Sequence, residues 1–376
     1  MKIGFTFPLD YSGISTYARH LIRELAAYPD LELHLYTSFR RKAQLAQAFE
    51  HSTRFHYRNI LPHDLMLGNH LVPVTKLIQE GIWVVESFKV DLIHHTNPLF
   101  TPKWSRNIVV TVHDIFPLYM KALPGVKEKM EQNLKVIFED SKLIFVPTHF
   151  VREDIAQRLN IPKERLWVTH EAASENFKVI TPNWTLLEKY DLSAETPFLL
   201  HVSRIDYRKN LERMVEAYFA LPSSLKQQVQ FVVVTSGDKT ELNRAIEQGR
   251  ARGEGGTVKV LSDIPFEELL NLYNASLGFM FVSIAEGFGI PLLEAMQCGC
   301  PVITSTQTSL PEIAGNAALL VNPYDIDAIA QAMRQLIQSP ELRADLRKKG
   351  LERAQQFSWK KMAQETLNGY KHAVEG

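Results

Sequence analysis

The chain has 376 residues, of which 45% are hydrophobic and 22% charged, and its 42 basic residues balance 42 acidic ones. This length exceeds the usual size of one hydrophobic core and favours two domains of about 100 to 200 residues each. The zero net charge excludes a global field that would attract nucleic acid, so any site for an anion must be local.

The first half of the chain alternates short apolar segments with amphipathic ones. This pattern predicts strands at 2–7, 32–37, 92–95, 108–112 and 143–147, and helices at 16–28, 126–140 and 150–159. Such alternation is typical of a parallel, doubly wound sheet. The apolar run 3–7 stops at Pro8 and Asp10, so we expect a strand there and not a signal peptide. No apolar run reaches the roughly 20 residues of a membrane span.

The turn after the first strand, residues 8–16, contains a single glycine, Gly13. It lacks the G-x-G-x-x-G fingerprint, which argues against a dinucleotide-dependent enzyme such as an NAD dehydrogenase. We expect Gly13 to offer its backbone to a phosphate or to an acceptor substrate.

Residues 40–82 mix basic side chains with aromatic and aliphatic ones. This composition suits contact with an anionic membrane surface or a lipid-linked acceptor. The alternative is an exposed helix followed by a loop packed on the core. The residues concerned are Arg40, Arg41, Lys42, Arg54 and Arg58 with Phe49, Phe55, Tyr57, Leu61, Leu65, Met66 and Leu67.

His113 and Asp114 directly follow the strand 108–112, at its carboxyl end. Ligands of open parallel sheets bind at this end of the strands. We expect Asp114 to orient the imidazole ring of His113. The alternative is a structural histidine whose ring bonds to a neighbouring carbonyl.

A second series of strands follows residues 176–185, a proline-bearing stretch that we interpret as a hinge between domains 1–175 and 186–357. The predicted strands lie near 198–202, 230–235, 258–261, 278–283, 302–305 and 318–321, and a final helix lies within 358–376. The only two cysteines, Cys298 and Cys300, are too close for an ordinary disulfide and too few for a metal cluster. This cysteine usage fits a reducing cytoplasm.

Two cations, Arg204 and Lys209, follow the strand 198–202, and Asn210 is expected to cap the next helix. Arginine binds phosphate bidentately and lysine binds it as a point charge. Preorganised cations can stabilise the charge left on a departing nucleoside diphosphate, so a divalent metal is not required. The alternative is two solvated cations on a loop.

The most informative segment is Glu286-Gly287-Phe288-Gly289-Ile290-Pro291-Leu292-Leu293-Glu294, a glycine-bearing loop that opens a helix. A helix start that follows a strand attracts phosphate, and Gly287 and Gly289 let the main chain approach a ligand. On one continuous helix the two carboxylates would lie roughly 12 Å apart along the axis, wider than a glycosidase acid/base pair at roughly 5 to 9.5 Å.

We therefore expect separate roles for these carboxylates. Glu286 would face a sugar, and Glu294, in the first helical turn, would accept hydrogen bonds from two ribose hydroxyls. The alternatives are a solvated loop acid at Glu286 and a glutamate at Glu294 that merely complements the helix dipole. The other expected contacts to the nucleotide sugar are Gly287, Phe288, Gly289, Ile290, Leu292 and Leu261.

The triplet Asp325-Ile326-Asp327 has the D-x-D form of a manganese site. It precedes an amphipathic run at 326–337, so we interpret Asp325 as a helix cap and Asp327 as a first-turn acid. No metal site is predicted.

In their order and spacing, these segments resemble retaining, family-4-type glycosyltransferases (glycosyl transferases group 1), whose signature is E-x7-E. The resemblance rests on 286–294 with 298–303 following, on His113-Asp114, on 203–210 and on Phe357-Ser358-Trp359. It departs at residues 171–177, where relatives often show Asn-Gly-Val-Asp, and at Gly13, where many relatives carry two glycines.

The resemblance implies the GT-B fold, an α/β arrangement of two Rossmann-like domains whose parallel sheets face a central cleft. The helix within 358–376 would return to the N-terminal, acceptor-side domain. The implied catalytic residues are Glu286, Arg204, Lys209 and His113, with His113 contacting the donor sugar and Asp114 beside it. A front-face route would let the leaving phosphate help to deprotonate the acceptor, with no metal or other cofactor.

The implied activity is retaining transfer of a hexose from a nucleoside-diphosphate sugar to a saccharide or lipid-linked saccharide, in exopolysaccharide or cell-envelope glycan synthesis. UDP-glucose is the favoured donor and GDP-mannose also fits, since base recognition is expected from backbone groups near Ser236 and Leu261. We expect the protein in the cytoplasm, with peripheral membrane contact through 40–82. The alternatives are a non-catalytic sugar-binding or activating subunit and a sugar-nucleotide epimerase.

Overall fold

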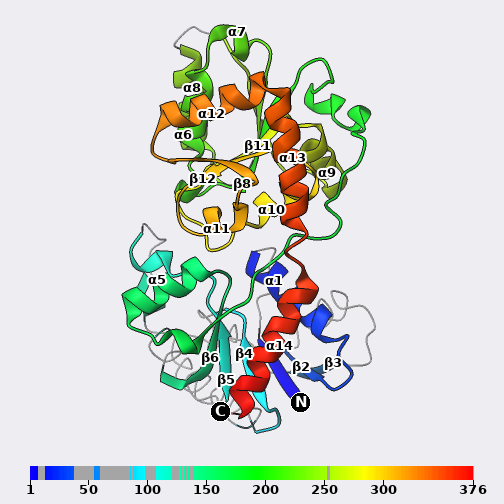
Figure 1. Cartoon of the computed structure of the whole chain (residues 1–376), viewed down its shortest axis with the longest axis vertical. Helices are drawn as coiled ribbons and strands as arrows, with labels where there is room; N and C mark the ends of the chain where they lie inside the picture. The colour runs from blue at the N-terminus through cyan, green and yellow to red at the C-terminus, as the bar shows by residue number, and fades with distance from the viewer. Residues whose placement is uncertain are drawn as a thin grey trace, which may run out of the picture. The chain divides into compact units, whose positions relative to one another are not determined.

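The computed structural model describes residues 1–6, 13–37, 55–59, 85, 88–97, 107–120, 127–128, 130–131, 134, 139–251 and 255–375. The chain divides into two compact units, Met1–Glu171 with Trp359–Gly376, and Ala172–Ser358 (Figure 1). Each unit is a parallel α/β sheet layered with helices, as the sequence predicts. Within the described ranges, no helix combines the length and the apolarity needed to cross a membrane.

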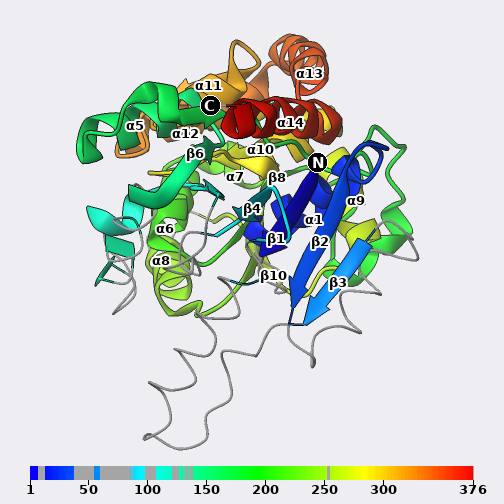
Figure 2. The ribbon, with the colours of Figure 1, turned by 90° about the horizontal axis from the view of Figure 1, so that it is seen from below.

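The first unit contains a seven-stranded parallel sheet with the order β3-β2-β1-β4-β5-β6-β7. Figure 2 shows β1, β2 and β3 side by side. The sequence prediction missed β3, which lies within the segment 40–82, and β7, which is too short to show a period. The rest of 40–82 lies outside the described residues. The strands are β1 (Lys2–Thr6), β2 (Glu32–Thr37), β3 (Phe55–Asn59), β4 (Leu92–His95), β5 (Ile108–Thr111), β6 (Ser141–Val146) and β7 (Leu166–Val168).

Helices cover both faces of this sheet. On one face α5 (His149–Leu159) packs over Val110 and Ile144. On the other, α14 (Trp359–Glu375) lies against α1 (Gly13–Leu25) and β6. A Cβ at Gly369 of α14 would stand 2.6 Å from the Phe145 ring, so only glycine allows this close approach. Most of the helix predicted at 126–140 lies outside the described residues.

The second unit contains a six-stranded parallel sheet with the order β10-β9-β8-β11-β12-β13. The strand order reverses beside β8, because β9 and β10 lie on one side of it and β11 to β13 on the other. Loops that follow β8 and β11 therefore meet at a topological switch point, where open α/β sheets bind ligands. The strands are β8 (Phe198–Arg204), β9 (Gln230–Ser236), β10 (Val258–Leu261), β11 (Gly278–Phe281), β12 (Val302–Ser305) and β13 (Ala318–Val321).

Side chains along β11 alternate between two layers. Met280 joins the core beneath α6, α8 and α12, whereas Phe279 packs against Tyr273 of α9 on the opposite face. The helices of this unit are α6 (Leu211–Phe219), α7 (Ser223–Lys226), α8 (Thr240–Ala251), α9 (Phe266–Ala275), α10 (Ile290–Gln297), α11 (Leu310–Ala314), α12 (Ile326–Gln338) and α13 (Pro340–Ala354).

The stretch expected to act as a hinge, residues 176–185, belongs to the second unit and is bonded to α9. The Ile180 N–H donates to Asn274 Oδ1 at 2.8 Å, and the Asn183 N–H donates to Asn271 Oδ1 at 2.6 Å. Movement at this stretch stays a prediction. Cys298 and Cys300 are buried free thiols, in agreement with the sequence interpretation.

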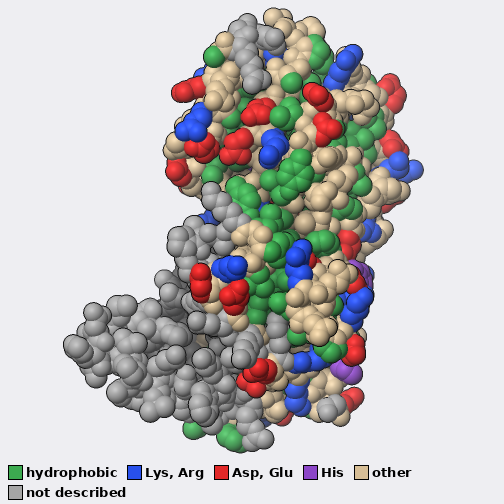
Figure 3. All heavy atoms as spheres, turned by 90° about the vertical axis from the view of Figure 1, so that its left-hand side faces the viewer, with side chains coloured by type: hydrophobic (Ala, Val, Ile, Leu, Met, Phe, Trp, Pro, Cys, Tyr) green, Lys and Arg blue, Asp and Glu red, His purple; other side chains and the backbone are tan. Residues whose placement is uncertain are grey.

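Charged side chains of both signs are mixed on the described part of one face of the molecule. The described part of the face in Figure 3 shows acidic and basic groups interspersed with apolar ones. This distribution matches the equal numbers of acids and bases in the sequence.

Candidate active site

The turn after β8 is a single 3-10 turn, η7 (Tyr207–Lys209), that directs two adjacent cations differently. Asp206 caps this turn, since its Oδ1 accepts the Arg208 N–H at 2.9 Å. The same carboxylate holds the Arg208 guanidinium at 2.8 Å. Lys209, the next residue, is thereby the cation of this turn that extends to the loop after β11.

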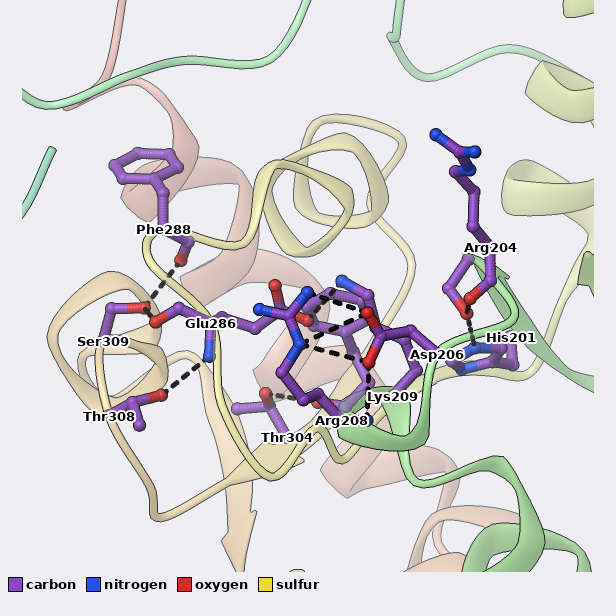
Figure 4. Close-up of polar contacts among 12 residues, drawn as sticks. His201, Arg204, Asp206, Arg208, Lys209, Glu286, Phe288, Thr304, Thr308 and Ser309 are labelled. Carbon is purple, nitrogen blue, oxygen red and sulfur yellow. Dashed lines mark hydrogen bonds and ion pairs between the residues drawn. The ribbon is translucent and has the colours of Figure 1, made fainter. Parts of the chain in front are cut away.

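Lys209 forms an ion pair with Glu286, with Nζ at 2.6 Å from Oε1 (Figure 4). Both side chains are mostly buried, with exposed fractions of 19% and 12%. The backbone around Glu286 is also held, because its N–H donates to Thr308 Oγ1 at 3.0 Å and its carbonyl accepts from Ser309 Oγ at 2.7 Å. The predicted partners Lys209 and Glu286 are therefore brought together on fixed loops.

Arg204 does not join this pair. It is the last residue of β8, its side chain is exposed, and it points away from Lys209 and Glu286 in Figure 4. Its guanidinium makes no ion pair with the part of the chain that the structure describes. The arginine remains available to a ligand at the same sheet edge.

The start of α10 requires glycine at residue 289. Gly289 has φ +103°, and a Cβ there would lie 2.8 Å from Leu310 Cδ2. The N–H of Leu292 bonds to the Gly289 carbonyl at 3.0 Å, and the side chains of Leu292 and Phe288 are buried. Contacts of these two residues with a substrate would therefore have to involve their backbone. Gly287 and Ile290 are partly exposed.

Glu294 is the fifth residue of α10, so the expectation that it lies in the first helical turn is wrong. The helix begins one residue before Pro291 and thus earlier than the proline suggested. Glu294 Oε2 accepts a hydrogen bond from the hydroxyl of Tyr273 at 2.9 Å. Burial raises the pKa of Glu294 to about 7. Tyr273 was missed by the sequence analysis because nothing local marks it.

His113 belongs to the first unit and lies just beyond β5. Its Nδ1 is 2.9 Å from Oε1 of Glu171, and its Nε2 is 3.3 Å from the Thr96 carbonyl. Asp114 instead accepts the Phe116 N–H at 3.1 Å. The expectation that Asp114 orients the ring is therefore wrong, because Glu171 has that position. The only sequence signal for Glu171 was its place in the segment that departs from the family pattern.

Asn210 is a third correction. It stands at the start of α6, but its side chain makes no cap hydrogen bond. Its Nδ2 donates to the carbonyls of Val282 at 3.0 Å and Pro323 at 2.7 Å, which ties the turn after β8 to the neighbouring loops. Asp325 does cap α12, as expected, since its Oδ1 accepts the Ala328 N–H at 2.9 Å.

Two further predicted contacts occupy the ends of elements. Gly13 is exposed at the first residue of α1, and Leu261 is the last residue of β10. His201, which was not predicted, lies buried under the turn after β8, where its Nδ1 donates to the Met280 carbonyl at 2.7 Å. Burial lowers the pKa of His201 to about 4, so the ring is neutral and structural.

Comparison with known proteins assigns the chain to a family. Residues 183–353 match the family described as Glycosyl transferases group 1, and residues 11–173 match Glycosyltransferase Family 4. The chain is 31% identical to O-antigen chain mannosyltransferase B of Escherichia coli over 99% of this chain and 100% of that protein. The chain is a group 1 glycosyltransferase.

Other relatives of this glycosyltransferase are more distant. The serotype-specific mannosyltransferase WbdA of Escherichia coli is 26% identical over 81% of this chain, which spans 38% of the length of WbdA. A sucrose-phosphate synthase from Thermosynechococcus elongatus has a TM-score of 0.75 at 22% identity, with coverage of 99% of this chain and 98% of that one. Anabaena HepE, in complex with UDP and glucose, has a TM-score of 0.76 at 17% identity, with 99% and 100% covered. These structural likenesses show the GT-B fold of the glycosyltransferase.

Proposed function

We propose that this glycosyltransferase moves a mannosyl residue from a nucleoside diphosphate mannose to a hydroxyl of a saccharide acceptor, with retention at the anomeric carbon. The observation that carries the proposal is the Lys209–Glu286 ion pair at the switch point of the second sheet. It stands in a chain that aligns from end to end with a relative named as a mannosyltransferase.

The sugar is proposed as mannose and not as the glucose favoured from sequence. Several relatives, including one at 31% identity, are named mannosyltransferases. The solved complex of HepE with UDP and glucose has only 17% identity to this chain and supports the fold alone. The earlier preference for UDP stays a prediction, and the experiment below separates it from GDP.

The proposed chemistry places leaving-group stabilisation on the cations. The exposed Arg204 ends β8 and Lys209 lies in the turn after it, so a diphosphate bound at this sheet edge would receive bidentate and point-charge contacts. As Lys209 turns to phosphate, the Glu286 carboxylate becomes free to accept hydroxyls of the sugar. We propose that this charge supply makes a divalent metal unnecessary.

The acceptor is proposed as a saccharide, in particular a lipid-linked one. The relative named for O-antigen chain synthesis motivates this choice. A cytoplasmic location with peripheral membrane contact through 40–82 belongs to the same proposal, but that segment lies outside the described residues except at β3.

The test is release of free nucleotide by the purified chain from GDP-mannose, UDP-mannose, UDP-glucose and UDP-galactose, each with and without mannose-terminated acceptors. We expect release with a mannosyl donor that requires an acceptor, and a product whose anomeric configuration by NMR matches the donor. Nucleotide binding without release would instead indicate a non-catalytic subunit. Conversion of the donor without an acceptor would indicate an epimerase, and either outcome overturns the proposal.

A further inference from the structure

A pocket lies in the second unit, between helix α13 and the segments that lead into β11 and β12. Its volume is about 190 Å³, which gives room for about six water molecules or for one phosphate group. Helix α13 forms one wall and runs beside α10 (Figure 1). The residues that matter for its chemistry are Ser276, Gly299, Cys300, Arg343, Ala344 and Arg347.

This pocket and the candidate active site lie at opposite edges of the same sheet. Leu277 and Pro301, which also line the pocket, directly precede β11 and β12. The loop that carries Glu286 follows the carboxyl end of β11 instead. A strand of four residues spans roughly 13 Å, so a small ligand in one place does not reach the other. The pocket is therefore not part of the site proposed for the nucleotide sugar.

Two arginines on successive turns of α13 give the pocket its charge. Arg343 and Arg347 are four residues apart, so their side chains are neighbours on the helix surface, and like charges in this arrangement repel each other. None of the described residues that line the pocket is a carboxylate, and neither guanidinium forms an ion pair within those residues. Asp345, which lies between the arginines in sequence, pairs with Lys349 at 2.6 Å. An anion in the pocket would offset the repulsion.

Both guanidiniums are held in place by main-chain carbonyls. Nη1 of Arg343 donates to the carbonyls of Leu336 at 2.7 Å and Ile337 at 2.8 Å. Nη1 of Arg347 donates to the Gly299 carbonyl at 2.9 Å. A Cβ at Gly299 would lie 2.5 Å from that nitrogen, so only glycine permits this contact. Within the described part of the chain these bonds use one nitrogen of each guanidinium, and the other N–H groups can donate to a ligand.

The remaining polar groups of the pocket are neutral. Cys300 is buried, and burial raises the pKa of its thiol to about 12. Its Sγ lies 3.0 Å from the hydroxyl of Ser276, which donates to the Tyr273 carbonyl at 3.1 Å. The amide of Asn274, on the same wall, is fixed because it accepts the Ile180 N–H at 2.8 Å. The charge of the pocket is therefore that of its two arginines.

We propose that this pocket binds the phosphate group of a small molecule through Arg343 and Arg347, at a site separate from that of the nucleotide sugar. Arginines suit this ligand, because a planar guanidinium can donate two parallel hydrogen bonds to phosphate oxygens. The walls and the positive charge are in place before a ligand arrives, as in preformed ligand pockets. This proposal does not depend on the proposed function.

The first experiment is titration calorimetry of the full chain with inorganic phosphate, with ionic strength held constant by sodium chloride. We expect saturable binding in the parent and in Lys209→Ala, which lacks a cation of the candidate active site. Arg343→Gln and Arg347→Gln should each weaken this binding by about 10- to 100-fold, the usual worth of a hydrogen bond to a charged group. Lys348→Gln removes an exposed cation of α13 that does not line the pocket and should bind phosphate as the parent does.

A second pair of variants leaves both arginines in place. Ala344 is exposed and lines the pocket. Ala344→Glu would add a carboxylate that competes with phosphate for the guanidiniums, whereas Ala344→Gln adds a side chain of the same size without charge. We expect Ala344→Glu to lose phosphate binding and Ala344→Gln to keep it, with circular dichroism to show that both variants are folded.

Two sources share this chemistry, free phosphate and a phosphorylated sugar. Titration with glucose 6-phosphate separates them, since tighter binding than that of inorganic phosphate would show that the pocket also contacts the attached sugar. Phosphate binding that is absent from the parent at millimolar concentration, or unchanged in Ala344→Glu or in both arginine variants, would overturn the proposal. Loss of binding in Lys209→Ala alone would place the phosphate at the candidate active site and would also overturn it. A parent that binds phosphate here but transfers no sugar would refute only the proposed function.

Discussion

Lys209 and Glu286 are 77 residues apart in the sequence and form an ion pair of 2.6 Å between the loops that follow two adjacent strands, β8 and β11. The pair keeps a cation and a carboxylate at the switch point with their charges mutually satisfied. A nucleoside diphosphate sugar brings both an anion and hydroxyl groups, so each partner of the pair can turn to a complementary part of the same ligand.

Replacement of either partner should abolish most transfer while the fold persists. We expect Glu286→Ala and Lys209→Ala each to lower kcat by about 10²- to 10³-fold, the usual loss for a preorganised electrostatic group. The measurement is turnover of the donor that supports transfer in the nucleotide-release assay, with circular dichroism to confirm folding. Lys189→Ala removes an ion pair between an exposed lysine and the buried Glu268, remote in sequence from the loops after β8 and β11, and serves as the control with parental turnover. Near-normal turnover of Glu286→Ala would exclude its assigned role.

Protonation of Glu294 should weaken nucleotide binding. Its pKa is raised by burial from 4.5 to about 7, so the group changes from mostly protonated to mostly ionised as pH rises through that value. We expect nucleotide affinity of the parent, relative to Glu294→Gln, to increase as pH rises through about 7, because the carboxylate can accept both ribose hydroxyls. Titration calorimetry at several pH values measures this difference. Equal pH dependence in the two proteins would refute it.

The carboxyl group of Glu294 should have the opposite effect on folding stability, which should fall as pH rises. A folded-state pKa above the unfolded value stabilises the fold at low pH, and this contribution is lost as pH rises from 4.5 to about 7. Tyr273→Phe removes a hydrogen bond that favours the ionised form of Glu294. The pH dependence of nucleotide affinity and that of folding stability should therefore both move to higher pH in this variant. Denaturant unfolding of the parent and Glu294→Gln across that range checks the sign.

Gly289→Ala should destabilise the second unit and impair nucleotide binding. The alanine would adopt φ +103° with its Cβ 2.8 Å from Leu310, a combination of backbone strain and overlap. Gly237→Ala is the matched control, since it has φ +109° but an ordinary nearest contact of 3.4 Å. We expect about 1 to 2 kcal/mol of destabilisation from strain in both variants and a further loss only in Gly289→Ala. Equal urea midpoints for Gly289→Ala and Gly237→Ala would show that the Leu310 side chain moves aside without cost.

Removal of metal should not affect transfer. We expect full activity after chelation with EDTA, and a loss of about 0.5 to 2 kcal/mol of stability but not of turnover in Asp325→Ala, because Asp325 caps α12. Assays with and without EDTA and added manganese measure this. If transfer required manganese and Asp325→Ala weakened the response to manganese, residues 325–327 would have to be a metal site.

Patterns within one element were predictable, whereas contacts between distant segments were not. The buried strands and the cap at Asp325 follow from local periodicity and composition, and both are present in the structure. The pairings of Glu171 with His113 and of Tyr273 with Glu294 join residues 58 and 21 positions apart, so no local period reports them. The segment Phe55–Asn59 was interpreted from its mixture of basic and aromatic residues and not from the alternation of its side chains. The strand there was therefore missed.

The site residues show the same division. The sequence order of strands indicated that Arg204, Lys209 and Glu286 share one sheet edge, because parallel strands present their carboxyl ends together. The direction of each side chain, which the sequence does not show, determines which cation meets Glu286. Arg208 pairs with Asp206, and Arg204 extends away from Glu286. The substrate roles of these residues remain predictions.

The first unit is completed by a helix from the far end of the chain, and this has a consequence for synthesis. Without α14, the face of the sheet around Phe145 and His94 would lose Tyr370, which packs on both rings. Because α14 is made last, the first unit can close only when synthesis is complete, whereas the second unit, Ala172–Ser358, is continuous and does not need that helix. We expect a released chain that lacks 359–376 to protect Ala172–Ser358 from protease but not the first unit.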